Sequence, residues 1–493
     1  MLSSSSHMGT LYYGDNLDIL TRYIADESVD LVYLDPPFNS ARDYNAFFEE
    51  KDGTAAAAQI QAFKDTWEWN NDSRTAYEEL SLRADNLGSV MRAFMEILGP
   101  TDMMAYLAMM APRLVELHRV LKTTGSLYLH CDPTASHYLK LLLDAVFGKG
   151  CFRNEIIWSY RRWPTPAKFF QRMHDTLLFY TREQKKTHTF HTEYEANSKS
   201  YAKRFKGNTQ ILDPILKTKK IPVDEPSRGL PRRDVWELSI LAGSSKERLG
   251  YPTQKPVALL ERIILASSNP GDVVLDPFCG CGTSVDAAQK HGRQWIGIDI
   301  THLAITLIKS RLRDTYGADL KMKVLGEPTD LAGARALAAE NKYQFQWWAL
   351  GLVGARPAEE KKGADGGVDG KILFRDAPDP KQKPQTIIFS VKGGGVGVKD
   401  VRDLDSVVTK TGAAIGVLIS IEEPTKPMRE WAANTGNYAS AVNGAKFPRI
   451  QLRTIGQLLA GVAIERPSGN VTVDVTFKNA PKAKGKAHPE LGL

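Results

Sequence analysis

A carboxylate followed by two prolines and an aromatic ring, Asp35-Pro36-Pro37-Phe38, comes directly after an apolar run. An exocyclic amino group of adenine or cytosine is a poor nucleophile, because its lone pair is delocalised into the ring. The Asp35 carboxylate and the Pro36 carbonyl could accept the two amino hydrogens and direct the lone pair at an electrophile. The prolines fix that carbonyl without adding an N–H donor, and Phe38 offers a face on which a flipped-out base could stack. We interpret these four residues as catalytic; a proline turn that only ends a strand is the alternative.

A second loop, residues 276–283, carries glycines at alternate positions. Glycines let a ligand approach the backbone closely where a strand leads into a helix. An acid, Asp299, ends the next apolar run, a place where ribose hydroxyls are usually bound. Val285 replaces the third glycine of a pyrophosphate-binding fingerprint, which favours a nucleoside cofactor without phosphates. The candidate cofactor-binding residues from this part of the chain are Asp276, Phe278, Gly280, Gly282, Thr283 and Asp299.

Both loops need elements that bring them together. Apolar runs of strand length occupy residues 29–34, 125–130, 273–275 and 294–299, and helix-like stretches separate several of them. Strands that alternate with helices predict an α/β fold with a doubly wound, mostly parallel sheet. In such a sheet ligands bind at the carboxyl ends of the strands, where these polar loops would gather.

The composition limits the remaining possibilities. A chain of 493 residues predicts two or three domains. The net charge of +7 permits an anionic partner without requiring one. The four cysteines form no CxxC pair, so we expect a reduced, cytoplasmic compartment and no disulfide framework. No apolar run is long enough to cross a membrane, and the first residues do not resemble a signal peptide.

The stretch 152–250 is rich in Lys, Arg, Pro, Tyr and Trp and loses the alternating pattern. We interpret it as an insertion outside the sheet whose cations contact phosphates and base edges of double-stranded DNA. Arg161, Arg162 and Arg172 are the candidate DNA contacts, against the alternative of a solvated basic surface.

Residues 34–38 resemble the catalytic motif of DNA amino-methyltransferases, and residues 276–283 resemble their S-adenosylmethionine motif. Because the catalytic motif comes first, the order is similar to that of the β class. The resemblance extends from about Leu11 to Arg313. Two further segments resemble cofactor-side elements of the family, which adds Asp15, Thr253 and Lys255 to the candidate cofactor-binding residues.

This resemblance implies a Rossmann-like methyltransferase in three parts. These are a catalytic half at 11–151, a target-recognition insertion at 152–250 and a cofactor-binding half at 251–325. It implies direct methyl transfer from S-adenosylmethionine to a base amine, adenine N6 being favoured by the Asp form of the motif and cytosine N4 remaining open. Cytosine carbon-5 methylation is disfavoured, because the sequence has no Pro-Cys dipeptide. Methylation of RNA or protein is a third alternative, and a homodimer and a prokaryotic or viral origin are further expectations.

The segment 341–465 resembles the Mrr-type branch of restriction-endonuclease-like α/β folds. The resemblance implies Asp369 as a ligand of Mg²⁺ and Lys392 as the lysine that activates water. Two positions depart from the pattern, because Ser390 stands where Glu or Gln is expected and Gln346 stands where Glu is expected. A fused endonuclease of a restriction or defence system and a module that only binds or docks DNA therefore both remain open. The tail 478–493 lacks an apolar pattern and is expected to be disordered.

Overall fold

The structure is a computed structural model. It describes residues 9–37, 68–205 without 165, 167, 186 and 198, 208–212, 220–358 without 252 and 318, 367–376, 383–467, 473–477 and 480–482. Phe38 lies outside these residues, as does the tail 478–493 apart from 480–482.

A nine-stranded sheet forms the centre of the larger unit, and all of its neighbouring strands pair in parallel except at β5, which is antiparallel to β3 and β4. This arrangement confirms the expected mostly parallel α/β sheet. Across the sheet the strands are β10 (Val235–Glu237), β4 (Phe152–Ser159), β5 (His174–Thr181), β3 (Leu121–Cys131), β2 (Val29–Leu34), β11 (Val273–Asp276), β12 (Gln294–Asp299), β1 (Gly9–Tyr13) and β13 (Met322–Leu325).

Strand β2 illustrates why the central strands are apolar along their whole length. Successive side chains of a strand point to opposite faces of the sheet. Leu31 and Tyr33 accordingly join one buried cluster, while Val32 and Leu34 join another. Helices cover both faces, so neither set of side chains can be polar.

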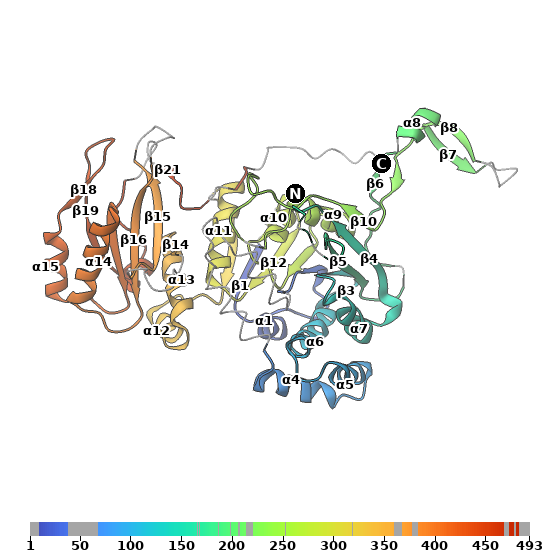
Figure 1. Ribbon diagram of the computed structural model, residues 1–493, viewed down its shortest axis with the longest axis horizontal. Helices are drawn as coiled ribbons and strands as arrows, with labels where there is room; N and C mark the ends of the chain where they lie inside the picture. Colours follow the sequence, from blue (N-terminus) through green and yellow to red (C-terminus); the bar gives the residue numbers. More distant parts are fainter. Residues whose placement is uncertain are drawn as a thin grey trace, which may run out of the picture.

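The helices of this unit divide between the two faces (Figure 1). On one face lie α1 (Asn16–Tyr23), α4 (Asn71–Ser81), α5 (Asn86–Leu98), α6 (Asp102–Val120) and α7 (Ser136–Phe147), followed by the short 3-10 helix η1 (Lys149–Cys151). On the other face lie α9 (Val257–Ser267), α10 (Thr283–Lys290) and α11 (His302–Tyr316). Within the first group, α4 and α5 form the outermost layer, at the bottom of Figure 1.

The stretch 152–250 does not lie wholly outside the sheet, and the sequence expectation is wrong for three of its segments. Strands β4, β5 and β10 belong to the nine-stranded sheet. The run Thr176–Tyr180 in β5 is fully buried, but the basic and aromatic residues on either side of it obscured the strand pattern.

The part of this stretch that leaves the sheet is an arm, defined here as residues 194–231. Its base is the pairing of β6 (Tyr194–Glu195) with β9 (Leu230–Pro231), and beyond it come α8 (Lys199–Phe205), β7 (Asn208–Leu212) and β8 (Lys220–Pro226). Figure 1 shows α8 and the β7–β8 hairpin projecting from the body of the protein.

The C-terminal unit is a smaller α/β structure with helices on both faces of its sheet. The strands β14 (Arg356–Pro357), β15 (Gly370–Arg375), β16 (Gln385–Lys392), β17 (Ile415–Ser420) and β20 (Ile450–Thr454) lie in this order, and β21 (Val473–Asp474) pairs with β15. A separate ribbon joins β18 (Asn437–Ala439) to β19 (Lys446–Pro448). The helices are α12 (Leu331–Glu340), α13 (Lys342–Leu352), α14 (Val398–Thr411), α15 (Lys426–Asn434) and α16 (Ile455–Leu459).

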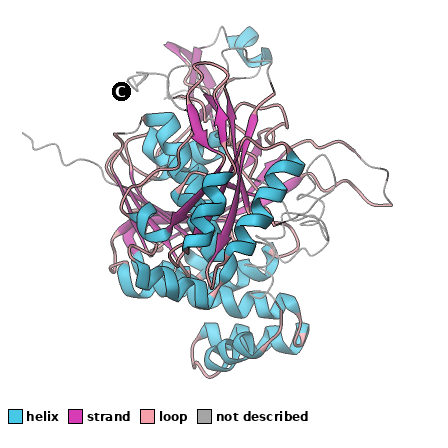
Figure 2. Ribbon diagram, turned by 90° about the vertical axis from the view of Figure 1, so that its left-hand side faces the viewer, coloured by secondary structure: helices cyan, strands magenta, loops and turns pink. Residues whose placement is uncertain are grey.

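The two units contact each other through α11 and α13. The His302 backbone N–H at the start of α11 donates to the Gln344 side chain on α13 at 3.3 Å. Ala480, within the tail expected to be disordered, is buried, and its N–H donates to Asp314 on α11 at 3.3 Å. Figure 2, turned by 90°, shows helices packed against strands.

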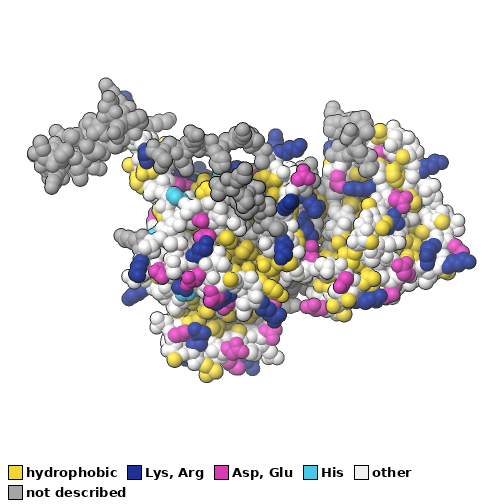
Figure 3. Space-filling model, turned by 180° about the vertical axis from the view of Figure 1, so that it is seen from behind, with side chains coloured by type: hydrophobic (Ala, Val, Ile, Leu, Met, Phe, Trp, Pro, Cys, Tyr) yellow, Lys and Arg dark blue, Asp and Glu magenta, His cyan; other side chains and the backbone are white. Residues whose placement is uncertain are grey.

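Surface charge, helix hydrophobicity and the state of the cysteines can each be set against the sequence expectations. On the face shown in Figure 3, Lys and Arg side chains are interspersed with acidic ones over both units, in keeping with the mild net charge. Among the described residues, no helix has the length and apolar character needed to cross a membrane. All four cysteines are buried and unpaired.

Candidate active site

Four acids lie at the carboxyl ends of neighbouring parallel strands. Asp35 follows β2, Asp276 ends β11, Asp299 ends β12, and Asp15 comes two residues after β1. These strands are consecutive in the sheet, so the two loops that sequence reasoning singled out meet at the same edge. Prolines 36 and 37 continue the chain from Asp35.

The Asp35 carboxylate is hydrogen-bonded to Lys255 and lies beside His130. The Lys255 ammonium donates a hydrogen bond to Oδ2, and the imidazole Nδ1 of His130 lies 3.9 Å from Oδ1. Asp35 and Lys255 have side chains only 16% and 15% exposed, so their ion pair is largely shielded from water. The structure therefore places Lys255, a candidate cofactor-binding residue, directly against the candidate catalytic carboxylate.

Behind Asp35 lies a buried polar chain that sequence reasoning missed. The Tyr33 hydroxyl lies 2.9 Å from His130 Nδ1, and His130 Nε2 donates to Asp175 at 3.2 Å. The Tyr160 hydroxyl donates to the other oxygen of Asp175 at 2.9 Å. Burial raises the pKa of Asp175, but the hydrogen bond from His130 and the nearby positive charges outweigh it, so the net shift is downward.

The loop between β11 and α10 has a geometry that only glycine permits at two positions. Gly280 has φ +49°, and a Cβ there would lie 3.1 Å from the Tyr251 ring. Gly282 has φ +72°, and a Cβ there would lie 2.8 Å from Ile308. Left-handed backbone and close packing together explain why both positions are glycine.

The two acids of this loop region are buried and hydrogen-bonded. Asp276 accepts from the Ser284 hydroxyl and, at 3.0 Å, from the Phe278 N–H, and burial raises its pKa to about 7. Asp299 accepts from the Gly280 N–H at 2.9 Å and from Thr301, and burial raises its pKa to about 6. Asp299 thus fixes the glycine loop itself.

Asp15 also has a structural task. Its carboxylate caps α1 by accepting from the Leu17 N–H at 2.8 Å, and it pairs with the buried Arg113 guanidinium at 2.7 Å. Arg113 donates as well to Asn16 at 2.6 Å, and Asn16 donates to the Pro277 carbonyl at 2.8 Å. These contacts tie the loop after β1 to the loop after β11.

The remaining candidates on the cofactor side differ in their exposure. Thr253 is exposed and Phe278 is half-buried. Thr283 is buried, and its hydroxyl accepts from Arg311 at 3.1 Å. Burial raises the pKa of both Cys279 and Cys281, which disfavours the thiolate form and a role as nucleophiles.

Arg161, Arg162 and Arg172 are exposed on the loop that joins β4 to β5. This loop begins at the carboxyl end of β4 and therefore lies at the same edge as Asp35. It also carries strongly exposed aromatic rings, Trp163, Phe169 and Phe170. Exposed cations beside exposed aromatic rings match the surface that contacts nucleic acid.

The residues expected to form a nuclease site do not fit Mg²⁺. Asp369 accepts a hydrogen bond from the Val391 N–H at 2.6 Å, and Lys392 pairs with Asp400 at 3.3 Å. Ser390 between them is buried and contributes no charge. No group of three or more potential metal-ligating His, Cys, Asp or Glu side chains occurs among the described residues. Mg²⁺ is usually bound through one or two carboxylates together with phosphate oxygens, and Asp369, Ser390 and Lys392 offer it only the lower number.

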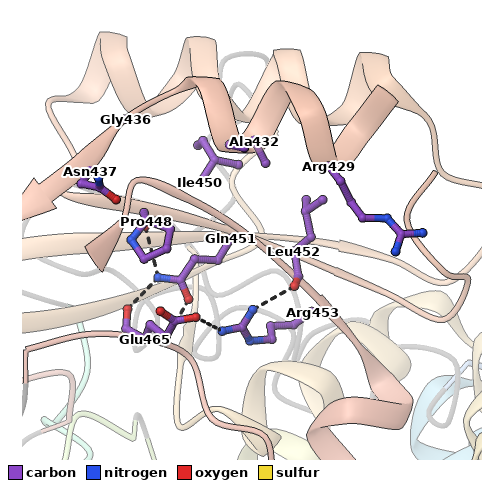
Figure 4. Close-up of a pocket in the computed structure, with 11 residues that line it drawn as sticks. Arg429, Ala432, Gly436, Asn437, Pro448, Ile450, Gln451, Leu452, Arg453 and Glu465 are labelled. Carbon is purple, nitrogen blue, oxygen red and sulfur yellow. Dashed lines mark hydrogen bonds and ion pairs between the residues drawn. The ribbon is translucent and has the colours of Figure 1, made fainter. Parts of the chain in front are cut away.

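A pocket of about 310 Å³ in the C-terminal unit lies between α15 and β20 (Figure 4). Its polar lining is largely paired within the protein, because Arg453 bonds to Glu465 at 2.9 Å and Gln451 donates to the Glu465 carbonyl at 2.6 Å. Neither Asp369 nor Lys392 lines it.

Comparisons with known proteins agree with this division into two units. Residues 342–447 match a family described as NACHT-associated inactive Restriction Endonuclease 1. The chain is 28% identical over 334 residues to the DNA adenine methyltransferase YhdJ of Escherichia coli (strain K12). This match covers 67% of this chain and 92% of the relative. It is also 28% identical over 313 residues to the type II methyltransferase M.HpaI of Haemophilus parainfluenzae, covering 63% of this chain and 76% of the relative.

Solved structures of low similarity include a DNA modification methylase from Thermus thermophilus complexed with S-adenosyl-L-methionine. It has 18% identity and a TM-score of 0.37, and the match covers 66% of this chain and 100% of that one. Residues 29–310, more than half of the chain, match the N6/N4 methyltransferase family described as DNA methylase, and the protein therefore belongs to that family.

Proposed function

We propose that the protein transfers a methyl group from S-adenosylmethionine to the N6 amine of adenine in double-stranded DNA. The observation that carries this proposal is the position of Asp35-Pro36-Pro37 beside the glycine loop, at the carboxyl ends of the adjacent strands β2 and β11. The adenine preference is supported by the relative described as an adenine methyltransferase and by the Asp form of the motif.

The acidic edge suits this methyl donor. Four carboxylates gather there, and Lys255 and Arg113 are each paired with one of them. Such a site favours a ligand that carries positive charge and hydroxyl groups, and it disfavours one that carries phosphates. S-adenosylmethionine supplies a methyl group on a positively charged sulfur, which a nitrogen lone pair can attack. Asp276, Asp299 and the backbone at Gly280 are the residues we assign to its binding.

Asp35 and Pro36 orient the acceptor. Each accepts one hydrogen of the amino group, so the nitrogen becomes more tetrahedral and its lone pair points along the line of transfer. As the N–C bond forms, the S–C bond breaks and its electron pair stays on sulfur. The nitrogen then releases one proton, which the Asp35 carboxylate can accept. Lys255 holds that carboxylate in place throughout.

The other parts receive roles in the same proposal. Residues 11–151 and 251–325 supply the catalytic and cofactor-binding halves, and the arm together with the β4–β5 loop recognises the target sequence. The C-terminal unit at 341–465 acts as a module for DNA binding or docking, since Asp369, Ser390 and Lys392 offer a metal ion a single carboxylate.

Transfer of labelled methyl groups to DNA tests the proposal. Asp35→Ala should abolish transfer and leave binding of the methyl donor unchanged. Asp26→Ala is the matched control, because Asp26 precedes the amino end of the same strand and is exposed. Sequencing with detection of modified bases then identifies the methylated base. Transfer by Asp35→Ala would remove Asp35 from its role, and label on cytosine would overturn the adenine assignment.

A further inference from the structure

The polar chain behind Asp35 is unusual in its burial. The His130 side chain has no solvent exposure, and Asp175 is only 17% exposed. The Trp158 ring stacks edge-on against the imidazole with centroids 5.5 Å apart, and Cys131 next to His130 is fully buried. Burying an imidazole and a carboxylate is costly unless they are paired with each other or with another polar group.

The buried polar chain extends from His130 in two directions, towards Asp35 and towards the β4–β5 loop. Towards the active site, His130 Nδ1 lies 2.9 Å from the Tyr33 hydroxyl and 3.9 Å from Asp35 Oδ1, so the imidazole packs beside the carboxylate without a direct hydrogen bond to it. Away from it, Asp175 accepts from both His130 and Tyr160, so it joins strand β5 to strand β3 and to the end of β4. The buried polar chain of hydrogen bonds therefore ends at Tyr160, where the β4–β5 loop begins.

Tyr160 is the point of contact with this loop. Its N–H donates to the Met173 carbonyl at 3.0 Å, which closes the base of the loop. The Arg162 guanidinium lies over the Tyr160 ring, 5.0 Å from its centroid, and donates to the Tyr160 hydroxyl at 3.3 Å. A ligand that binds the Arg162 guanidinium would therefore change the contacts of the Tyr160 ring and hydroxyl.

We propose that His130, held by Asp175, is a positioning residue for Asp35, and that Tyr160 connects this positioning to DNA contact at the β4–β5 loop. The inference rests on the proposed function, since it concerns the carboxylate that orients the base amine. DNA bound at Arg162 fixes Tyr160, Tyr160 fixes Asp175, and Asp175 sets the tilt of the imidazole against Asp35. Asp35 thus reaches its productive orientation when the loop is occupied.

Three substitutions test this proposal, because each should lower kcat without weakening binding of the methyl donor. His130→Asn and Asp175→Asn should each lower kcat about 10²-fold, the loss expected when a reacting group is misplaced by about 1 Å. Tyr160→Phe removes one hydrogen bond and should lower kcat on the order of tenfold. The dissociation constant for the methyl donor should remain that of the unmodified protein, which a general loss of structure would not allow.

Matched controls come from the same sheet and its flanking helix. Asp144→Asn removes a carboxylate that accepts from the Tyr180 hydroxyl at 2.7 Å, as Asp175 accepts from Tyr160. Tyr128→Phe, two residues before His130, removes a buried hydroxyl that lies 2.7 Å from Ser267. Both variants should keep the kcat of the unmodified protein.

The double variant Asp175→Asn/Tyr160→Phe should lose no more than Asp175→Asn alone, because both changes interrupt one chain. Multiplying losses would overturn the link through Tyr160. Unchanged kcat in Asp175→Asn, or equal losses in the controls, would overturn the positioning role even if His130→Asn fails to fold. Absence of methyl transfer by the unmodified protein would instead reject the proposed function, and this inference with it.

Discussion

The Lys255 ammonium donates a hydrogen bond to the Asp35 carboxylate, although the two residues lie 220 positions apart in the chain. Lys255 directly precedes Pro256, the N-cap of α9, and Asp35 follows strand β2, so the ion pair joins the cofactor-binding half to the catalytic half. Both side chains are largely buried, which makes the orientation of the carboxylate depend on the ammonium.

Lys255→Met removes the charge and keeps most of the stem. We expect kcat for methyl transfer to fall about 10²-fold, because Asp35 loses the group that fixes one of its oxygens. Single-turnover transfer with labelled donor measures this step directly. Lys290→Met is a suitable control, since Lys290 pairs with Glu261 on the surface. A faster Lys255→Met enzyme would mean that Lys255 blocks Asp35 instead of orienting it.

The buried acids Asp276 and Asp299 should make stability depend on pH. Their pKa values in the folded protein, about 7 and about 6, exceed the value of about 3.9 for an unfolded chain. Between about pH 4 and pH 7 the folded state therefore holds more protons than the unfolded state. Their contribution to stability is complete below about pH 4 and is lost as pH rises through about 6 and 7.

Asp276→Asn isolates this effect, because the amide cannot ionise. Thermal unfolding should show Tm falling from about pH 5 to about pH 8 more steeply in the unmodified protein than in the variant. Parallel curves for the two proteins would show that Asp276 is already ionised throughout this range.

The strand ends near Asp35, Asp276 and Asp299 could be predicted from the sequence, because continuous apolar runs stop abruptly at polar loops there. The helical cap formed by Asp15 could not be distinguished from a cofactor contact. An Asp side chain before a helix can cap the helix or bind a ligand. The hydrogen bonds that Asp15 accepts from Leu17 and Arg113 identify the structural role, and they are visible only in the structure.

Contacts between distant strands were beyond sequence reasoning. His130 and Asp175 meet because β3 pairs antiparallel with β5 in a register that sets Cys131 opposite Thr176. Register depends on the whole sheet, and a shift by one residue would turn His130 to the other face. A histidine at the end of an apolar strand was the one available signal.

The C-terminal unit should not cleave DNA with Mg²⁺ or Mn²⁺, because Asp369, Ser390 and Lys392 offer a metal ion a single carboxylate. That carboxylate, of Asp369, accepts a hydrogen bond from the Val391 N–H. Asp369→Asn should instead destabilise this unit by about 2 kcal/mol, since a hydrogen bond to a charged acceptor is weakened. Plasmid cleavage and Tm measure the two effects. Asp403→Asn, at an exposed position of α14, should leave Tm unchanged. Cleavage that disappears in Asp369→Asn would restore the nuclease interpretation.

Removal of the arm should separate target recognition from methyl-donor binding. Glu195 and Leu230 pair directly at its base, so a short Asn-Gly turn can replace residues 197–228. The base should persist, because the ion pairs of Arg232 with Glu193 and of Arg233 with Glu195 remain. Affinity for a cognate site, measured at fixed salt, should fall on the order of 10³-fold towards that for unrelated DNA, while donor binding is unchanged. If the shortened protein methylated the same sites as the full chain, recognition would have to reside in the β4–β5 loop or the C-terminal unit.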